Sequence, residues 1–215
     1  MSVKEDIKRL TDDEIRELDN EYCSWGDTAH YSKEPKIFSS CEGSYMYDSN
    51  DTPYLDLQMW YASCNLGYKN KRVSEAVVDQ INTMPGIAPK FIYNYKALLS
   101  EKIAKGMMKR FGEKGRVHFN VGGAQAIEDA IKVLRNYTHK NRQFAFMGGY
   151  HGRTIGASCI TSSYRYRESY GHFGDRAHFV PFPYCFRCHY GKKCESCNFY
   201  CVKQFAKNFE SEYNS

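Results

Sequence analysis

One stretch of the chain, residues 116–136, constrains the possible folds more than any other. RVHFNVGGAQAIEDAIKVLRN begins with a short apolar run, passes through Gly122 and Gly123, and continues with apolar residues at helical spacing. Two further apolar runs follow this helix, so the pattern predicts three strands, at residues 116–119, 143–149 and 177–182. Such strand–helix–strand alternation indicates an α/β fold with a largely parallel sheet.

The rest of the chain is predicted to be mostly helical. Residues 44–57 are typical of two short strands around an Asn-Asp-Thr-Pro turn. Thr11 offers a second starting point within the first helix. Apolar residues at helical spacing predict further helices over residues 3–19, 72–84, 95–108 and 201–213.

Composition and charge exclude several classes of protein. Hydrophobic residues make up 42% of the 215 residues and charged residues 26%, as in a globular rather than a disordered chain. The net charge of +5 is mild and spread along the chain, so we expect no nucleic-acid partner. No apolar run reaches the ~18 residues of a membrane span, and the N-terminus lacks a signal-peptide core. We therefore expect a cytoplasmic protein without membrane contact, whose nine cysteines are reduced or bind metal.

The glycine pair opens a helix, where unpaired N–H groups and the helix dipole favour an anion. The sequence around Gly122 and Gly123 lacks both the Lys-Ser/Thr of a P-loop and the spacing of the dinucleotide fingerprint. The remaining pattern, a strand followed by a glycine-rich turn and a helix, suits a single phosphate held by the N–H groups of Gly123, Ala124 and Gln125. The alternative is a plain tight turn with a glycine cap.

A second glycine-rich loop, GGYHGRT at residues 148–154, follows the next predicted strand. Ligand sites in open α/β sheets lie at the carboxyl ends of strands, so both loops are expected on the same rim. There the Tyr150 ring can lie against a planar aromatic ligand, and His151 can hydrogen-bond to it or polarise it. The alternative is a glycine-rich turn with a structural histidine.

Three stretches together resemble a known family. FNVGGAQAIEDAIKVLRN, GGYHGRTIGASCITSS and YLDLQMWYASCNLGYKNKRVSEAVVDQI are similar to segments of the class III (ornithine/GABA-type) aminotransferases, pyridoxal 5′-phosphate enzymes of fold type I. The resemblance runs from about residue 35 to the end of the chain. It implies an incomplete fold type I: an N-terminal arm and small-domain segment in residues 1–90, and the first part of the large cofactor-binding domain in residues 91–215.

The resemblance also implies which residues bind the cofactor phosphate. Gly123 and Ala124 match the backbone positions of the family that contact it. Gly122 stands where a serine is usual, and Gln125 where a glutamate is usual. One side-chain contact to the phosphate is therefore expected to be missing or replaced.

Four aromatic or imidazole side chains receive roles in the same way. Tyr150 matches the residue that stacks on the pyridine ring, and His151 matches the histidine beside it. Trp60 and Tyr61 fall in the segment that lines the substrate entrance of the family, although aromatic residues there also suit an interface core.

The sequence departs from the family in what it lacks. The lysine that holds the cofactor covalently, the aspartate that pairs with the pyridinium nitrogen, and a phosphate-contacting threonine belong to later segments of the family. We therefore expect an N-terminal portion or split half of an aminotransferase that acts on an amino acid or ω-amine, with no catalytic residue in this chain. A homodimer or a complementary chain carrying the C-terminal half would complete the site. A catalytically dead family member is an alternative.

A cysteine-rich segment, CFRCHYGKKCESCNFYC, supplies the last hypothesis. Two C-x-x-C pairs can hold zinc or an iron–sulfur cluster, and His189 lies between them. A metal-binding interaction module is therefore a second candidate function, and thiols packed without a metal are the simpler alternative. The candidate ligands are Cys185, Cys188, Cys194 and Cys197, with Cys201 nearby.

Overall fold

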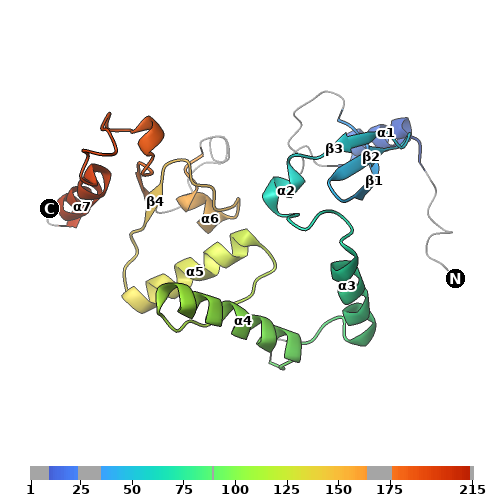
Figure 1. Cartoon of the computed structure of the whole chain (residues 1–215), viewed down its shortest axis with the longest axis horizontal. Helices are drawn as coiled ribbons and strands as arrows, with labels where there is room; N and C mark the ends of the chain where they lie inside the picture. Colours follow the sequence, from blue (N-terminus) through green and yellow to red (C-terminus); the bar gives the residue numbers. More distant parts are fainter. Residues whose placement is uncertain (1–9, 24–34, 89, 164–175, 214–215) are drawn as a thin grey trace. The chain divides into compact units, whose positions relative to one another are not determined.

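The computed structural model describes residues 10–23, 35–88, 90–163 and 176–213 (Figure 1). They belong to two compact units, residues 1–92 and residues 93–215. Each unit is described by itself.

The first unit begins with helix α1 (Asp12–Tyr22). Thr11 caps it: its hydroxyl accepts a hydrogen bond from the Glu14 N–H, and the Glu14 carboxylate accepts one from the Thr11 N–H at 2.8 Å. This reciprocal cap explains why the helix starts at the second point indicated by the sequence. Residues 3–9 of the predicted helix lie outside the described residues.

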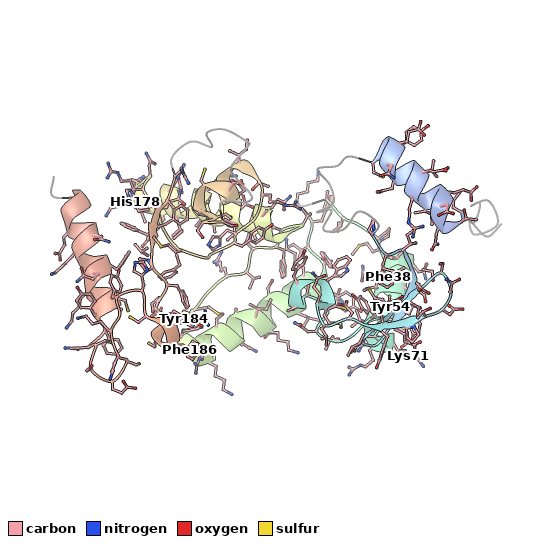
Figure 2. All side chains as sticks on the ribbon, turned by 90° about the horizontal axis from the view of Figure 1, so that it is seen from above. Phe38, Tyr54, Lys71, His178, Tyr184 and Phe186 are labelled. Carbon is pink, nitrogen blue, oxygen red and sulfur yellow. The ribbon has the colours of Figure 1, made fainter. Side chains whose placement is uncertain are left out.

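Three antiparallel strands follow, in the order β1 (Phe38–Glu42), β2 (Tyr45–Asp48) and β3 (Pro53–Leu55). The two strands predicted in residues 44–57 are thus confirmed as β2 and β3. The Phe38 and Tyr54 rings meet edge to face, with centroids 5.5 Å apart (Figure 2). Asp48 closes the turn by accepting from the Asn50 and Thr52 N–H groups, both at 3.0 Å.

Helix α3 (Lys71–Thr83) confirms the predicted helix of the first unit and is capped by Asn70, whose side chain accepts from the Val73 N–H. The short element α2 (Met59–Ala62) was not expected. All four of its residues have positive φ, from 45° at Met59 to 64° at Ala62, so this turn winds with the left hand. Asp56 accepts from the Gln58 and Met59 N–H groups at 2.9 and 3.1 Å, which ties down the start of the turn.

The second unit contains two long helices, α4 (Asn94–Phe111) and α5 (Gly123–Thr138), close to their predicted bounds. The strand predicted at residues 116–119 is wrong: within the described residues this segment pairs with no strand. It is bound to α5 instead, since His118 Nε2 lies 3.0 Å from the Asp129 carboxylate.

The predicted strands after α5 are confirmed as β4 (Phe144–Phe146) and β5 (His178–Val180), which pair in parallel. Helices α6 (Ile155–Ile160) and α7 (Tyr200–Tyr213) complete the unit. The buried side chains gather on β4, α6 and β5 and are small: Ala145, Ala157, Ser158, Cys159, Thr161, Ala177 and Val180.

Large apolar side chains remain exposed on three helices, although their spacing is that of a buried face. On α5, Val133 and Leu134 are more than half exposed, and on α3 so are Val77 and Ile81. The largest set lies on α4 and comprises Leu98, Leu99, Ile103, Met107, Met108 and Phe111. Exposed apolar side chains gathered on one helix, as on α4, favour an interaction with another surface.

Candidate functional site

The start of α5 presents free backbone donors. Gly122 is its N-cap, with extended backbone and no side-chain cap, and its carbonyl accepts from the Ala126 N–H at 3.0 Å. The N–H groups of Gly123, Ala124 and Gln125 precede that first helical bond and point out of the helix end. A Cβ on Gly123 would meet no atom within 4 Å, so the space beside the first of these donors is open.

The Gln125 side chain folds back over the cap. Its Oε1 lies 2.9 Å from the position that a Cβ on Gly122 would occupy. A serine at position 122 would therefore push the amide aside. The two positions at which this chain differs from the family pattern are thus physically coupled, because the glycine makes room for the glutamine.

The second glycine loop meets the first turn of α5. Gly152 has φ +131°, and a Cβ on it would lie 2.6 Å from the Ala124 Cβ. Only a residue without a side chain fits there. This close approach brings the loop that carries Tyr150 and His151 against the helix start that carries the free N–H groups.

Glu128, which the sequence reasoning missed, fastens this junction. From α5, its Oε1 accepts from the Thr154 hydroxyl at 2.6 Å and from the N–H groups of Gly156 and Ala157 at 2.8 and 3.3 Å. It thereby caps α6 from another helix. A signal was present: Glu128 lies on the same side of α5 as Ala124 and Ile131, and a carboxylate beside apolar residues needs partners.

The end of α6 holds the backbone of the loop. The Thr161 hydroxyl is fully buried, accepts from the His151 N–H at 3.0 Å and points at the carbonyls of Gly152 and Ala157. The Ser162 hydroxyl accepts from the Gly148 N–H at 2.6 Å. The loop is therefore fixed at both ends, which preorganises it.

The two side chains of the loop differ in exposure. Tyr150 is 55% exposed. His151 is half-buried, and its Nε2 lies 3.2 Å from the position that a Cβ on Gly149 would occupy. The imidazole is thus folded back over its own loop.

Trp60 and Tyr61 belong to the left-handed turn of the first unit. They are 72% and 78% exposed. Bulky L-residues prefer the β or right-handed α region of backbone conformation. The positive φ of Trp60 and Tyr61 is therefore unfavourable, and the surrounding structure must hold it.

The cysteine segment does not form the expected metal centre. Among the described residues, which include Cys185, Cys188, Cys194 and Cys197, no three cysteine, histidine or acidic side chains converge as metal ligands. The Cys197 thiol turns to the Cys194 carbonyl at 3.4 Å, and the His189 ring packs edge to face on Tyr190. The zinc or iron–sulfur hypothesis, and with it the metal-binding module, is therefore unsupported.

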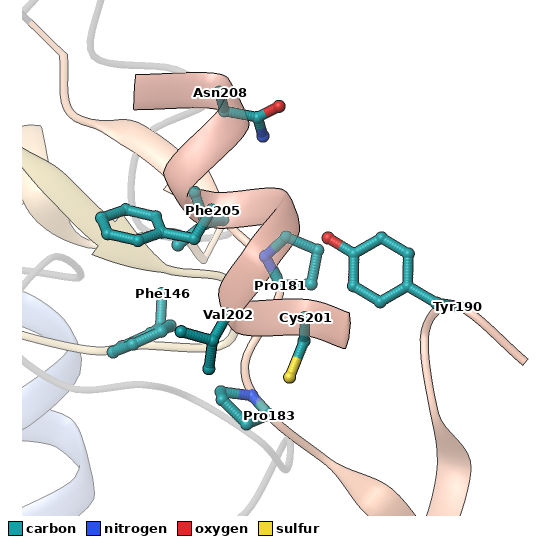
Figure 3. A pocket seen from close by; sticks show the side chains of 9 residues that line it. Phe146, Pro181, Pro183, Tyr190, Cys201, Val202, Phe205 and Asn208 are labelled. Carbon is teal, nitrogen blue, oxygen red and sulfur yellow. The ribbon is translucent and has the colours of Figure 1, made fainter. Parts of the chain in front are cut away.

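An apolar cavity of about 220 Å³ lies between α7 and the two parallel strands (Figure 3). Phe146, Val202 and Phe205 line it together with Pro181 and Pro183. It contains neither glycine loop and no acidic or basic side chain. We interpret it as a gap in the packing of α7 rather than as a ligand site.

Comparison with known proteins gives consistent results. A family model described as aminotransferase class-III matches residues 28–212. Leucine/methionine racemase of Thermococcus litoralis is 31% identical over 182 residues, which are 83% of this chain and 40% of the racemase. Acetylornithine aminotransferase of Halalkalibacterium halodurans is 32% identical over 156 residues, 71% of this chain and 38% of that enzyme. The chain thus spans about two fifths of these relatives.

Solved structures show the same fold. The taurine:2-oxoglutarate aminotransferase of Bifidobacterium kashiwanohense, in complex with PLP and glutamate, matches 97% of this chain and 46% of its own, with TM-score 0.79 and 23% identity. An (S)-enantioselective omega-transaminase from Thermomicrobium roseum matches 96% and 48%, with TM-score 0.81 and 22% identity. The expected fold type I is therefore confirmed over part of its length. Within the described ranges, no helix has the length and hydropathy needed to cross a membrane.

Proposed function

Because the chain belongs to the class III aminotransferases, we propose that it supplies the phosphate-binding and ring-stacking part of a pyridoxal-phosphate site. The observation that carries this proposal is the junction at Gly152, where the loop bearing Tyr150 approaches the open N-terminus of α5. The complete enzyme moves an amino group between an amino acid or ω-amine and a 2-oxo acid.

The residues at the start of α5 fit a phosphate group. Gly123 brings no side chain into the approach, and the N–H groups of Gly123, Ala124 and Gln125 can donate to phosphate oxygens. The Gln125 amide lies over the cap and brings no negative charge against the phosphate. Pyridoxal phosphate, when bound, supplies the electron-withdrawing ring that makes chemistry at the amine carbon possible.

Tyr150 and His151 take the ring side of the site in this proposal. The exposed face of Tyr150 stacks on the pyridine ring, and His151 hydrogen-bonds at its edge. Because Thr161 and Ser162 fix the loop backbone, little conformational freedom is lost when the ring binds.

Trp60 and Tyr61 line the substrate entrance in our proposal. Their exposure and their left-handed backbone support a contact role, since side chains held against conformational preference cluster at functional sites. Residues 1–90 then form the N-terminal arm and small-domain segment, and residues 91–215 the first part of the large domain.

The lysine that binds the cofactor covalently comes, in this proposal, from the part of the family fold that this chain does not span. That part lies in the same polypeptide or in a second chain, and the complete enzyme is a cytoplasmic homodimer. The exposed apolar faces of α3, α4 and α5 support such a partner, because about 25 cal/mol is gained per Å² of apolar surface covered.

Amino-acid racemisation is a second candidate function. It is favoured by the leucine/methionine racemase of T. litoralis and by an isoleucine 2-epimerase of Lentilactobacillus buchneri, 26% identical over 90% of this chain. A racemase returns the proton to the carbon from which it came and needs no 2-oxo acid. Formation of the D-enantiomer from an L-amino acid without any 2-oxo acid separates the two activities in the completed enzyme.

The test of the phosphate seat uses inorganic phosphate and pyridoxal phosphate on the full chain. Gly123→Asp places a carboxylate at the start of α5, where it suits the helix dipole but repels a phosphate. We expect binding by the native chain and at least about tenfold weaker binding by this variant. Gly115→Asp, where a side chain also meets no atom within 4 Å, is the matched control and should bind normally. Equal phosphate affinities of the Gly123→Asp and Gly115→Asp variants would show that the phosphate does not bind at the start of α5.

A pull-down of the tagged chain tests for the complementary half. Co-purification of a polypeptide that carries an aminotransferase-type lysine supports a completed enzyme. A chain that binds phosphate yet recovers no activity with that polypeptide would support the catalytically dead alternative.

A further inference from the structure

Five thiols lie between the end of β5 and the first turn of α7, and they do not form a metal site. Cys185, Cys188, Cys194, Cys197 and Cys201 all line one small cavity of about 20 Å³. All five are free thiols. Such a concentration of thiols on one short segment has no role in the site described above.

Two of these thiols are more accessible than the others. Cys185 and Cys194 line the same cavity and are both exposed, whereas the other three are half-buried. Cys197 is engaged elsewhere, because its thiol donates to the Cys194 carbonyl. Cys185 and Cys194 are therefore the two thiols of this cavity that a solute reaches most easily.

The surroundings of the thiols set how their reactivity depends on pH. Lys192 lines the same cavity, with its Nζ 5.1 Å from the Tyr200 ring centroid. The hydrogen bond with Cys194 raises the pKa of the Cys185 thiol, and the nearby Cys197 and Cys201 act in the same direction. Attack through a thiolate is therefore expected to accelerate as the pH rises.

We propose that Cys185 and Cys194 form a dithiol that is oxidised to an intramolecular disulfide by a small-molecule disulfide such as glutathione disulfide. One cysteine thiolate attacks the glutathione disulfide, which forms a mixed disulfide and releases one glutathione thiolate. The second cysteine thiolate then attacks the protein sulfur of the mixed disulfide and releases the second glutathione. Two protein thiols are oxidised, one glutathione disulfide is reduced to two glutathiones, and the two protons pass to the leaving thiolates.

The oxidised pair closes the loop that runs from η3 (Cys185–Arg187) to the turn before α7. Tyr184 and Phe186, whose rings lie 6.1 Å apart, flank Cys185 in this loop (Figure 2). A disulfide there would restrain the approach to α7.

The test is disulfide mapping of the full chain after incubation with mixtures of glutathione and its disulfide. Free thiols are blocked with N-ethylmaleimide before digestion with trypsin, which cuts after Arg187, Lys192 and Lys193 and so separates the two cysteines. We expect a mass loss of about two units and a cross-link between peptides 177–187 and 194–203, assigned to Cys194 by fragmentation. The yield should rise with pH.

Matched variants sharpen the result. Cys194→Ser should abolish the cross-link, whereas Cys188→Ser, in the same cavity, should leave it in place. Cross-links spread evenly over the five cysteines would overturn the proposal. So would one equivalent of zinc that co-purifies with the wild-type chain and protects the thiols from oxidation.

Discussion

Glu128 is the residue whose removal tests the architecture of the site most directly. Its carboxylate accepts two short hydrogen bonds, from the Thr154 hydroxyl at 2.6 Å and the Gly156 N–H at 2.8 Å, and a longer one from the Ala157 N–H at 3.3 Å. Glu128→Ala leaves all three donors without this acceptor. We expect a loss of about 2–3 kcal/mol, combining one charge-assisted bond with a helix cap, because water replaces part of what is removed.

Hydrogen exchange followed by mass spectrometry measures this locally. A loss of about 2–3 kcal/mol corresponds to roughly 30- to 150-fold faster amide exchange in residues 154–162. Glu128→Gln keeps an acceptor oxygen and loses the charge, so its effect should be smaller than that of Glu128→Ala.

The same hydrogen-exchange experiment includes a control variant and an outcome that would contradict the prediction. Glu101→Ala removes an exposed carboxylate that pairs with Lys105 at 2.7 Å, and should change stability by less than about 0.5 kcal/mol. Unchanged exchange of residues 154–162 in Glu128→Ala would show that the carboxylate does not hold the junction, and our explanation of how the loop is positioned would be wrong.

Three further predictions follow from single residues. Gly152→Ala forces a Cβ against Ala124 and should lose at least about 1–3 kcal/mol of stability together with phosphate binding, measured by urea unfolding and phosphate titration. Gly106→Ala, in the middle of α4 with no atom near the new Cβ, should instead stabilise the chain by about 0.5–1 kcal/mol in the same unfolding assay. The hydrogen bond from the Thr52 N–H holds the pKa of the Asp48 carboxyl below its usual 3.8, so its contribution to stability is present above that value and lost as the pH falls through the folded pKa. Unfolding followed between about pH 5 and 2 should show Asp48→Asn to be less acid-sensitive than the native chain.

Sequence patterns predicted the long helices well because each has a local cause, whereas the short helices α2 and α6 were not expected. Thr11 and Asn70 cap their helices through side chains adjacent in the chain, and the apolar spacing of α4 and α5 is periodic. The strand expected at residues 116–119 depended instead on a neighbour in space, and an apolar run alone does not supply one. The segment is held through His118 and Asp129, an interaction that spacing does not reveal.

The residues of the candidate site likewise include some that local sequence predicts and some that depend on distant contacts. The glycines could be identified from the sequence because glycine before a helix has few explanations. The position of Glu128 beside apolar residues indicates that it needs partners, but not which ones, since Thr154 and Gly156 lie 26 and 28 residues further along the chain. The cysteine spacing suggested a metal because spacing constrains the backbone, whereas the direction of each thiol depends on local bonds such as that of Cys197.

The left-handed turn at Met59–Ala62 has a stereochemical consequence. Each L-residue in that region costs roughly 1–2 kcal/mol, and the mirror-image amino acids prefer it for the same steric reason. A chain assembled by chemical ligation with D-alanine at position 62 should therefore be more stable than the natural one, while an L-to-D exchange in α3 should destabilise it. Among the genetically encoded amino acids, only glycine adopts positive φ without this steric cost. Glycine at positions 60 and 61 would, however, remove the exposed indole and phenol rings of this turn.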